Sequence, residues 1–352
     1  MKTTIEKLPG DTEGVSYEVT VFRFKGTSRK APTAYIQAAL HAGELPGVVA
    51  IHALMPKLRA AEAEGRILGD ITIVPQANPV GRAQYHFGEV QGRFHLGTRT
   101  NFNRDFPLLD RPDASALPPV PPGSTVDARL KRLLVELSMG HDIVLDLHCD
   151  FESVSYLYAP AQLWPAMQDC AAALGVEAVL LWDGESGAAF EEAAIHPWLQ
   201  VPPEKAGLDR RVVTTVEYRG LRDVEASYAK SDAEGIYRLL SIRGVVADQK
   251  AAKSRKFTGV AAPIGNVEMI SMPRAGAILF HVAPGKRVRK GAKLATIVHS
   301  PGEDDGATDL HAPQAGYVLT RSAHRSGRAG DDIIKLVGEV RSAKPKNGAL
   351  ED

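Results

Sequence analysis

Two short motifs in the first half of the chain contain residues of the types that bind zinc. His41 and Glu44 stand three positions apart in the segment HAGE, between an apolar stretch and a helical pattern. Zinc accepts imidazole nitrogen and carboxylate oxygen at about 2.0–2.2 Å, and catalytic zinc sites keep one position for water. Both side chains can face one point from such a turn. A solvated turn without metal is compatible with the same sequence.

The second motif, DLH, ends an apolar stretch at His148. Residues two apart on a strand point to the same side, so Asp146 lies where it could orient a metal-bound imidazole of His148. The alternative is a strand end closed by a hydrogen-bonded histidine. The adjacent Cys149 is interpreted as a small apolar filler.

Two further motifs suit binding and proton transfer. In NFNRDFP, Arg104 offers a planar guanidinium fork that matches a carboxylate, and Asn103 adds a hydrogen-bond donor. In VEYRG, Glu217 follows an apolar run, and a glutamate beside a metal can activate bound water. The alternatives are a loop held by its own side chains and an ion-paired surface glutamate.

Alternating strand and helix patterns predict the elements that position these residues. Such alternation favours an α/β fold with a mostly parallel or mixed sheet and helices on both faces. Sites in such sheets lie beyond the carboxyl ends of strands, which is where His41, His148 and Glu217 occur. Strands are predicted at 17–24, 33–40, 71–77, 142–148, 153–159, 178–182 and 212–218, and helices at 46–63, 124–139, 161–174 and 223–242. The sequence STVD at 124–127 predicts a capping box.

After about residue 245 only short β-like runs remain, punctuated by Gly and Pro. We predict a catalytic domain over 1–250, a small all-β domain over 251–340 and a disordered tail over 341–352. The phrases VAPGKRVRKGAKLATI and HAPQAGYV resemble the barrel-sandwich fold of lipoyl and biotinyl carriers. The connecting stretch HSPGEDDGATDLHAP contains no Lys to modify, so we interpret the domain as a lid or an interface.

The bulk composition excludes several classes of function. Of 352 residues, 42 are Lys or Arg and 42 are Asp or Glu, so a net charge of zero argues against nucleic-acid or anionic-membrane partners. Two cysteines imply no disulfide framework. We see neither a signal peptide nor a membrane span, so we expect a cytoplasmic protein that could form a homo-oligomer.

The order HxxE, NxNR, DxH and a late Glu on a strand resembles the succinylglutamate desuccinylase/aspartoacylase family, a branch of the carboxypeptidase-A-like zinc hydrolases. The resemblance covers roughly residues 30–245 and extends to the β-rich appendage. It implies a carboxypeptidase-like fold and one zinc ion per chain. The zinc ligands that it implies are His41, Glu44 and His148.

The same resemblance implies roles for residues around the metal. Asn103 and Arg104 would hold a substrate carboxylate, and Glu217 would act as the general base. The family also has an arginine that polarises the scissile carbonyl. Arg93 and Arg99 both compete for this role, and their spacing does not decide between them.

The predicted function is zinc-dependent hydrolysis of the amide bond of a small N-acyl amino acid. Aspartoacylases have a further arginine for an acidic substrate, and neither Arg210 nor Arg211 matches its motif. Asp183 and Glu185 could instead receive a cationic side chain if they face the site; otherwise they form a solvated turn. N-acetylated neutral or basic amino acids, such as the N-acetyl-2,4-diaminobutyrate that some relatives deacetylate, therefore rank ahead of acidic ones. The alternatives are a metallocarboxypeptidase acting on peptides and a non-catalytic metal-binding protein.

Overall fold

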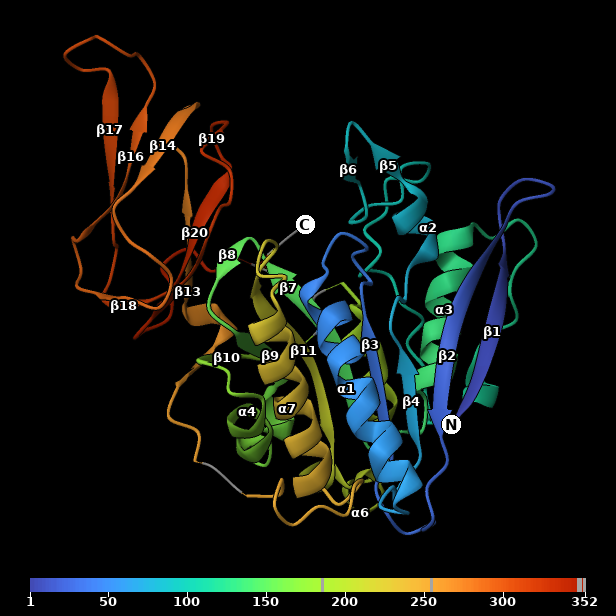
Figure 1. The fold of residues 1–352 in the computed structure, drawn as a ribbon. Helices are drawn as coiled ribbons and strands as arrows, with labels where there is room; N and C mark the ends of the chain where they lie inside the picture. Colours follow the sequence, from blue (N-terminus) through green and yellow to red (C-terminus); the bar gives the residue numbers. More distant parts are fainter. Residues whose placement is uncertain (185–186, 254–255, 347–349, 351–352) are drawn as a thin grey trace.

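The computed structural model describes every residue except 185–186, 254–255, 347–349 and 351–352. Its largest element is a nine-stranded sheet in the order β1-β2-β4-β3-β7-β11-β9-β10-β12 (Figure 1). The four central strands β4, β3, β7 and β11 are parallel. The strands of this sheet are β1 (Lys2–Pro9), β2 (Ser16–Phe24), β3 (Ala34–Ala38), β4 (Ile71–Val74), β7 (Ile143–Asp150), β9 (Tyr156–Pro160), β10 (Ala178–Trp182), β11 (Val212–Gly220) and β12 (Val260–Pro263).

Helices cover both faces of this sheet. On one face α1 packs against α7, and α7 packs against α4, in front of the strands in Figure 1. On the other face α5 contacts β7, β11 and α3. The helices are α1 (Pro46–Ala63), α2 (Pro79–Ala83), α3 (Val126–Ser138), α4 (Gln168–Leu174), α5 (Phe190–Leu199), α6 (Pro203–Ala206) and α7 (Ala226–Ile242), with 3-10 turns at Ala114–Ala116, Ala161–Leu163, Leu208–Arg210 and Ile264–Asn266.

Strand β7 shows how the two faces differ. All eight of its residues are buried, as expected for a strand covered on both sides. Leu147 faces α1, whose Gly47 lies directly against it. Asp146 and His148 alternate with Leu147 and therefore face the α5 side. The register pairs His148 with Glu217 of β11, so these two side chains are neighbours at the carboxyl end of the sheet.

The C-terminal part forms two antiparallel sheets. One has the order β13-β20-β18-β15, and the other has the order β17-β16-β14-β19. Ile278, Leu294 and Leu336 belong to the apolar core of this part. The strands are β13 (Val267–Ser271), β14 (Gly276–Phe280), β15 (Arg287–Val288), β16 (Lys293–Val298), β17 (Ala307–His311), β18 (Gly316–Arg321), β19 (Ser326–Gly327) and β20 (Asp332–Gly338).

Within the described residues, two strand pairings connect the parts. The short strand β8 (Glu152–Ser153), which follows β7, pairs with β18 of the C-terminal part. Strand β12, beyond residue 250, pairs with β10 of the large sheet. The remaining strands, β5 (Tyr85–His86) and β6 (Glu89–Val90), form a small hairpin above α2 in Figure 1.

The predicted fold class is confirmed: a mixed α/β sheet with helices, followed by antiparallel sheets. The helix predicted over 161–174 is wrong in its first half, where a 3-10 turn ends before Pro165 and α4 begins only at Gln168. The capping box predicted at 124–127 does not form, because the N-cap residue Thr125 makes no side-chain cap. Among the described residues, none of the helices has the length and apolar character to cross a membrane.

Candidate active site

The turn between β3 and α1 carries His41 and Glu44. Strand β3 ends at Ala38, and Pro46 begins α1 at a position where the missing N–H of proline costs nothing. Between them the Glu44 N–H donates to the His41 carbonyl at 2.9 Å. Asn78, the N-cap of α2, donates from its side chain to the Leu40 carbonyl at 2.8 Å. The turn is therefore held from within and from outside.

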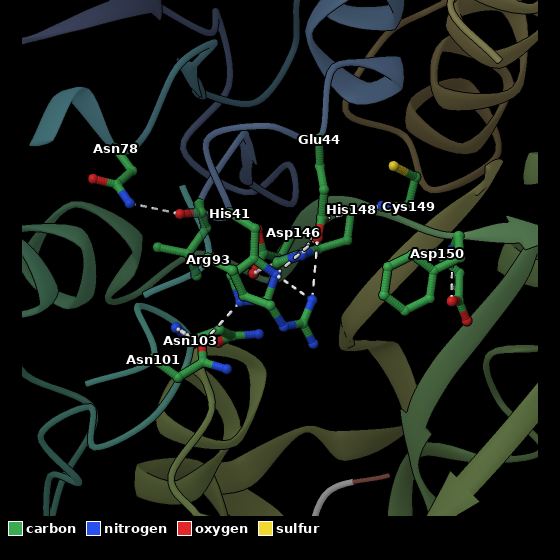
Figure 2. Close-up of polar contacts among 12 residues, drawn as sticks. His41, Glu44, Asn78, Arg93, Asn101, Asn103, Asp146, His148, Cys149 and Asp150 are labelled. Carbon is green, nitrogen blue, oxygen red and sulfur yellow. Dashed lines mark hydrogen bonds and ion pairs between the residues drawn. The ribbon is translucent and has the colours of Figure 1, made fainter. Parts of the chain in front are cut away.

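His41, Glu44 and His148 form a buried cluster. The Nδ1 atom of His41 lies 2.9 Å from one oxygen of Glu44, and the Nδ1 atom of His148 lies 2.8 Å from the other. One potential ligand atom from each residue falls within 4.8 Å of the others. Figure 2 shows the three side chains converging from the β3–α1 turn and from β7. This set is one carboxylate and two imidazoles, a donor set that zinc accepts.

The Nε2 atoms of both imidazoles also have hydrogen-bond partners. These partners determine whether the Nδ1 atoms can bind a metal. The Nε2 atom of His148 lies 2.8 Å from Asp146, and the Nε2 atom of His41 lies 2.9 Å from the side-chain oxygen of Asn101. An oxygen acceptor at Nε2 keeps the proton there and leaves the Nδ1 lone pair for a metal. Asp146 is itself fixed by Gln37, which donates to it at 3.0 Å. The residues therefore fit a divalent metal bound through Nδ1.

Without a cation, the charges of the cluster balance one another. Burial opposes the charged form of His148, but the carboxylates of Asp146 and Glu44 outweigh it and raise the His148 pKa. Burial would also raise the pKa of Glu44, yet His41 and His148 hold it below its ordinary value. For His41, burial lowers the pKa against the pull of Glu44. The carboxylates of Glu44 and Asp146 therefore favour a positive charge at the imidazoles, which a bound cation would supply.

Arg93 and Arg99 have different positions on one doubled-back loop. The Phe102 N–H donates to the Arg93 carbonyl at 3.0 Å, and this pairing brings Arg93 to the cluster. One guanidinium nitrogen of Arg93 lies 3.5 Å from Glu44. Arg99 lies at the exposed tip of the loop with a φ of 60°. The structure thus brings Arg93, and not Arg99, to the cluster.

Asn103, Arg104 and Glu217 line a cavity with the three cluster residues. The Asn103 side-chain oxygen accepts the N–H of Phe190 at 2.8 Å. The NH2 end of this side chain is the group that could donate to a substrate. Arg104 donates to the Asn103 carbonyl at 2.6 Å. Trp182, Glu191 and Thr215 also belong to the polar part of this wall. We name this space the inner cavity.

A second cavity also borders the cluster. His41, Glu44 and Arg93 line it together with an apolar set that the inner cavity lacks. We name this space the outer cavity. Its apolar residues include Val90, Phe94, Leu96, Phe151 and Leu221.

Comparison with known proteins identifies the family. The model of the succinylglutamate desuccinylase/aspartoacylase catalytic domain matches residues 30–243. The chain belongs to this family. The match includes every residue of the cluster and of the polar inner wall named above.

Solved structures and a curated relative agree with this membership. A putative succinylglutamate desuccinylase/aspartoacylase family protein from Shewanella amazonensis SB2B superposes with a TM-score of 0.85 at 26% identity, over 96% of this chain and 99% of that one. The product-bound ectoine utilization protein EutE (DoeB) of Ruegeria pomeroyi shares the fold, with a TM-score of 0.71 at 19% identity over 96% and 94%. The N-alpha-acetyl-L-2,4-diaminobutyric acid deacetylase of Halomonas elongata is 23% identical over 89% of this chain and 84% of its own.

Within this family member, the residues considered for substrate choice lie apart from the cluster. Arg211 precedes β11, at the opposite end of the strand from Glu217, and stacks on Trp198 at 3.1 Å from the ring centroid. Arg210 lies in the same turn. Asp183 is exposed and accepts a hydrogen bond from Gln162. Glu185 lies outside the described residues.

Sequence reasoning missed three residues that support or line the site of this family member. Asn101 stands in the NxNR motif, and its spacing from Asn103 was the available signal for a partner of His41. Gln37 was hidden within an apolar strand. Glu191 lies in α5, which the sequence did not predict because most residues of that helix are buried and no polar face marks its period.

Proposed function

We propose that this protein hydrolyses the amide bond of a small N-acyl amino acid, with one zinc ion bound by His41, Glu44 and His148. The observation that carries the proposal is the buried cluster with a carboxylate, Glu217, on the adjacent strand in the same cavity. Membership of a family of desuccinylases and aspartoacylases supports amide hydrolysis as the reaction. The fit of both imidazoles to a metal at Nδ1 supports the cofactor.

Each residue at the site has a separate role in the proposed reaction. When bound, zinc would polarise the acyl carbonyl and lower the pKa of a water molecule. Glu217 takes a proton from this water as its oxygen attacks the acyl carbon, and then delivers the proton to the amide nitrogen as the C–N bond breaks. The Arg93 guanidinium stabilises the negative charge that develops on the carbonyl oxygen. The products are a carboxylic acid and a free amino acid.

The two cavities orient the substrate. Arg104 and the NH2 group of Asn103 hold the carboxylate of the amino acid in the inner cavity. The acyl group then extends past the cluster into the outer cavity, whose apolar residues favour an uncharged acyl chain. An acetyl group meets this condition, whereas a succinyl group would place a carboxylate among apolar side chains.

We rank N-acetylated neutral or basic amino acids, including N-acetyl-2,4-diaminobutyrate, ahead of N-acetylaspartate and N-succinylglutamate. Neither Arg210 nor Arg211 lies among the residues that line the inner cavity. The activity named for the Halomonas elongata relative supports the same ranking.

A substrate panel tests this proposal. The zinc-loaded protein is assayed with N-acetyl-2,4-diaminobutyrate, a neutral N-acetyl amino acid, the two acidic substrates and a dipeptide. We expect kcat/KM to favour the first two, and Glu217→Gln to keep its zinc while losing about 100-fold or more in kcat. Preference for the dipeptide would instead support a carboxypeptidase. Unchanged kcat in zinc-loaded Glu217→Gln would remove that residue as the base.

A further inference from the structure

Glu191 is a buried carboxyl group on the wall of the inner cavity. It belongs to the first turn of α5 and is 7% exposed. Its Oε2 atom is buried and has no hydrogen-bond partner among the described residues. A buried carboxylate oxygen without a partner is rare in native proteins, because its desolvation is not compensated. Its position in a ligand cavity indicates that a ligand supplies the partner.

The electrostatic surroundings define the charge of that ligand. Burial, together with the neighbouring carboxylates of Glu192 and Asp146, raises the pKa of Glu191 to about 7. Thr215 of β11 lines the same cavity, and its hydroxyl lowers the pKa of the Glu191 carboxyl group. A cationic group with several N–H donors would satisfy both the charge and the open acceptor positions, as an ammonium group does.

The position of Glu191 relative to the proposed carboxylate site sets where this cation belongs on the substrate. The Asn103 side chain accepts the N–H of Phe190, the residue before Glu191 in α5. The Asn103 side chain, which is proposed to hold the substrate carboxylate, is therefore bonded to the residue next to Glu191. The side chain of the substrate branches from the α-carbon that also carries this carboxylate. We therefore expect a short substrate side chain to reach Glu191.

We propose that Glu191, with Thr215 beside it, forms a subsite for the side-chain ammonium group of a basic N-acyl amino acid. This proposal rests on the proposed function, since it places the substrate by its carboxylate at Asn103 and Arg104. It assigns to Glu191 the role of a specificity-determining residue. Neither exposed Asp183 nor the distant Arg211 contributes to this subsite.

Two substrates of equal shape isolate the ammonium group. L-2,4-diaminobutyrate and L-norvaline differ only in a terminal NH3+ against CH3, so the kcat/KM ratio of their Nα-acetyl derivatives measures the contribution of the charge. We expect the wild-type protein to prefer the diaminobutyrate derivative by about 100-fold, and Glu191→Gln to reduce this ratio to less than about 10. Glu192→Gln is the matched control, because Glu192 is buried on the same turn but bonds to the Ala189 N–H. We expect it to change this ratio much less than Glu191→Gln does, because Glu192 does not line the inner cavity.

Direct binding separates failure of the subsite from failure of the proposed function. Calorimetry with zinc-loaded protein and the free amino acids should show L-2,4-diaminobutyrate binding more tightly than L-norvaline, with Glu191→Gln losing the difference. If neither amide is hydrolysed but this difference is found, the hydrolase proposal fails and the subsite stands. A wild-type protein that does not favour the ammonium compound in either experiment overturns the subsite, as does an unchanged ratio in Glu191→Gln. The wild-type comparison decides even where the variant does not fold.

Discussion

At the scale of single residues, the cluster is organised by pairs of contacts on each imidazole. Glu44 bridges the two Nδ1 atoms, while Asn101 and Asp146 hold the two Nε2 atoms. The sequence predicted Glu44 and Asp146, because ligand types at a fixed spacing are visible in a string of letters. It could not predict that the side-chain oxygen of Asn101, sixty positions from His41, would contact the Nε2 atom of that histidine. This contact depends on the course of a loop.

The metal proposal predicts the behaviour of His148→Ala. This variant should lose most of the zinc that the wild-type protein binds while keeping its far-UV circular dichroism, because β7 remains buried between helices. Elemental analysis of both proteins after equal dialysis measures the loss. His141→Ala is the matched control, since that histidine bonds to Thr72 away from the cluster. Full zinc in His148→Ala would remove His148 from the ligand set.

The different positions of Arg93 and Arg99 predict different kinetic effects. Arg93→Gln should lower kcat/KM by about 100-fold or more, because a fixed charge that stabilises the developing oxyanion is lost. Arg99→Gln, at the exposed tip of the same loop, should remain close to wild type. Steady-state kinetics of the two zinc-loaded variants with one N-acetyl amino acid tests this. Equal losses in both variants would contradict the assignment of Arg93.

At the scale of elements, the site depends on how closely α1 approaches the sheet. A Cβ atom on Gly47 would lie 2.6 Å from the Leu147 Cβ and 3.1 Å from the Ala38 Cβ, so only glycine permits this contact. Helix α1 was predicted from its apolar period with its observed bounds. Its distance from β7 was not, because the role of Gly47 appears only when Leu147 is placed opposite it. Strand β1 and helix α5 were missed for lack of a polar–apolar period.

Gly47→Ala should therefore disturb both stability and metal binding. We expect the unfolding free energy to fall by about 1–3 kcal/mol, because the added methyl group has no space. Affinity for the proposed zinc should also fall, since α1 must move and Glu44 lies only two residues before it. Denaturant unfolding and competition with a chelator measure the two effects. The exposed His52→Ala on the same helix should change neither, and wild-type affinity in Gly47→Ala would show that the turn moves independently of α1.

At the scale of the whole molecule, buried polar contacts join the large sheet to the C-terminal part. Lys335 of β20 lies 2.8 Å from Asp150, two residues beyond His148, and Asp150 also accepts the hydroxyl of Tyr156. The Tyr317 hydroxyl lies 2.8 Å from Glu177. The sequence predicted a separate β-rich part from its changed pattern. It could not predict these contacts, because an isolated lysine or aspartate carries no signal of a partner 185 positions away.

The buried Lys335–Asp150 pair predicts a large effect of Lys335→Met. Removing the cation leaves a carboxylate that is only 1% exposed, which typically costs about 3 kcal/mol or more of unfolding free energy. Lys293→Met removes a half-exposed partner of Asp309 in the same part and should change stability little. Urea unfolding of each variant provides the comparison. The double variant Lys335→Met with Asp150→Asn should recover part of the loss; no recovery would mean that the lysine acts by packing alone.

The pairing of β8 with β18 has a consequence during protein synthesis. Ser153 and Leu319, which share a hydrogen bond across this pairing, are 166 positions apart. At ribosomal rates of about 5–20 residues per second, roughly 10–30 s separate the emergence of these two segments. His41, Glu44 and His148 all precede Ser153, so the nascent chain carries its proposed ligands well before the strand that will pair beside them exists. We therefore expect the proposed ion to have an interval in which to reach these residues before the C-terminal part is synthesised.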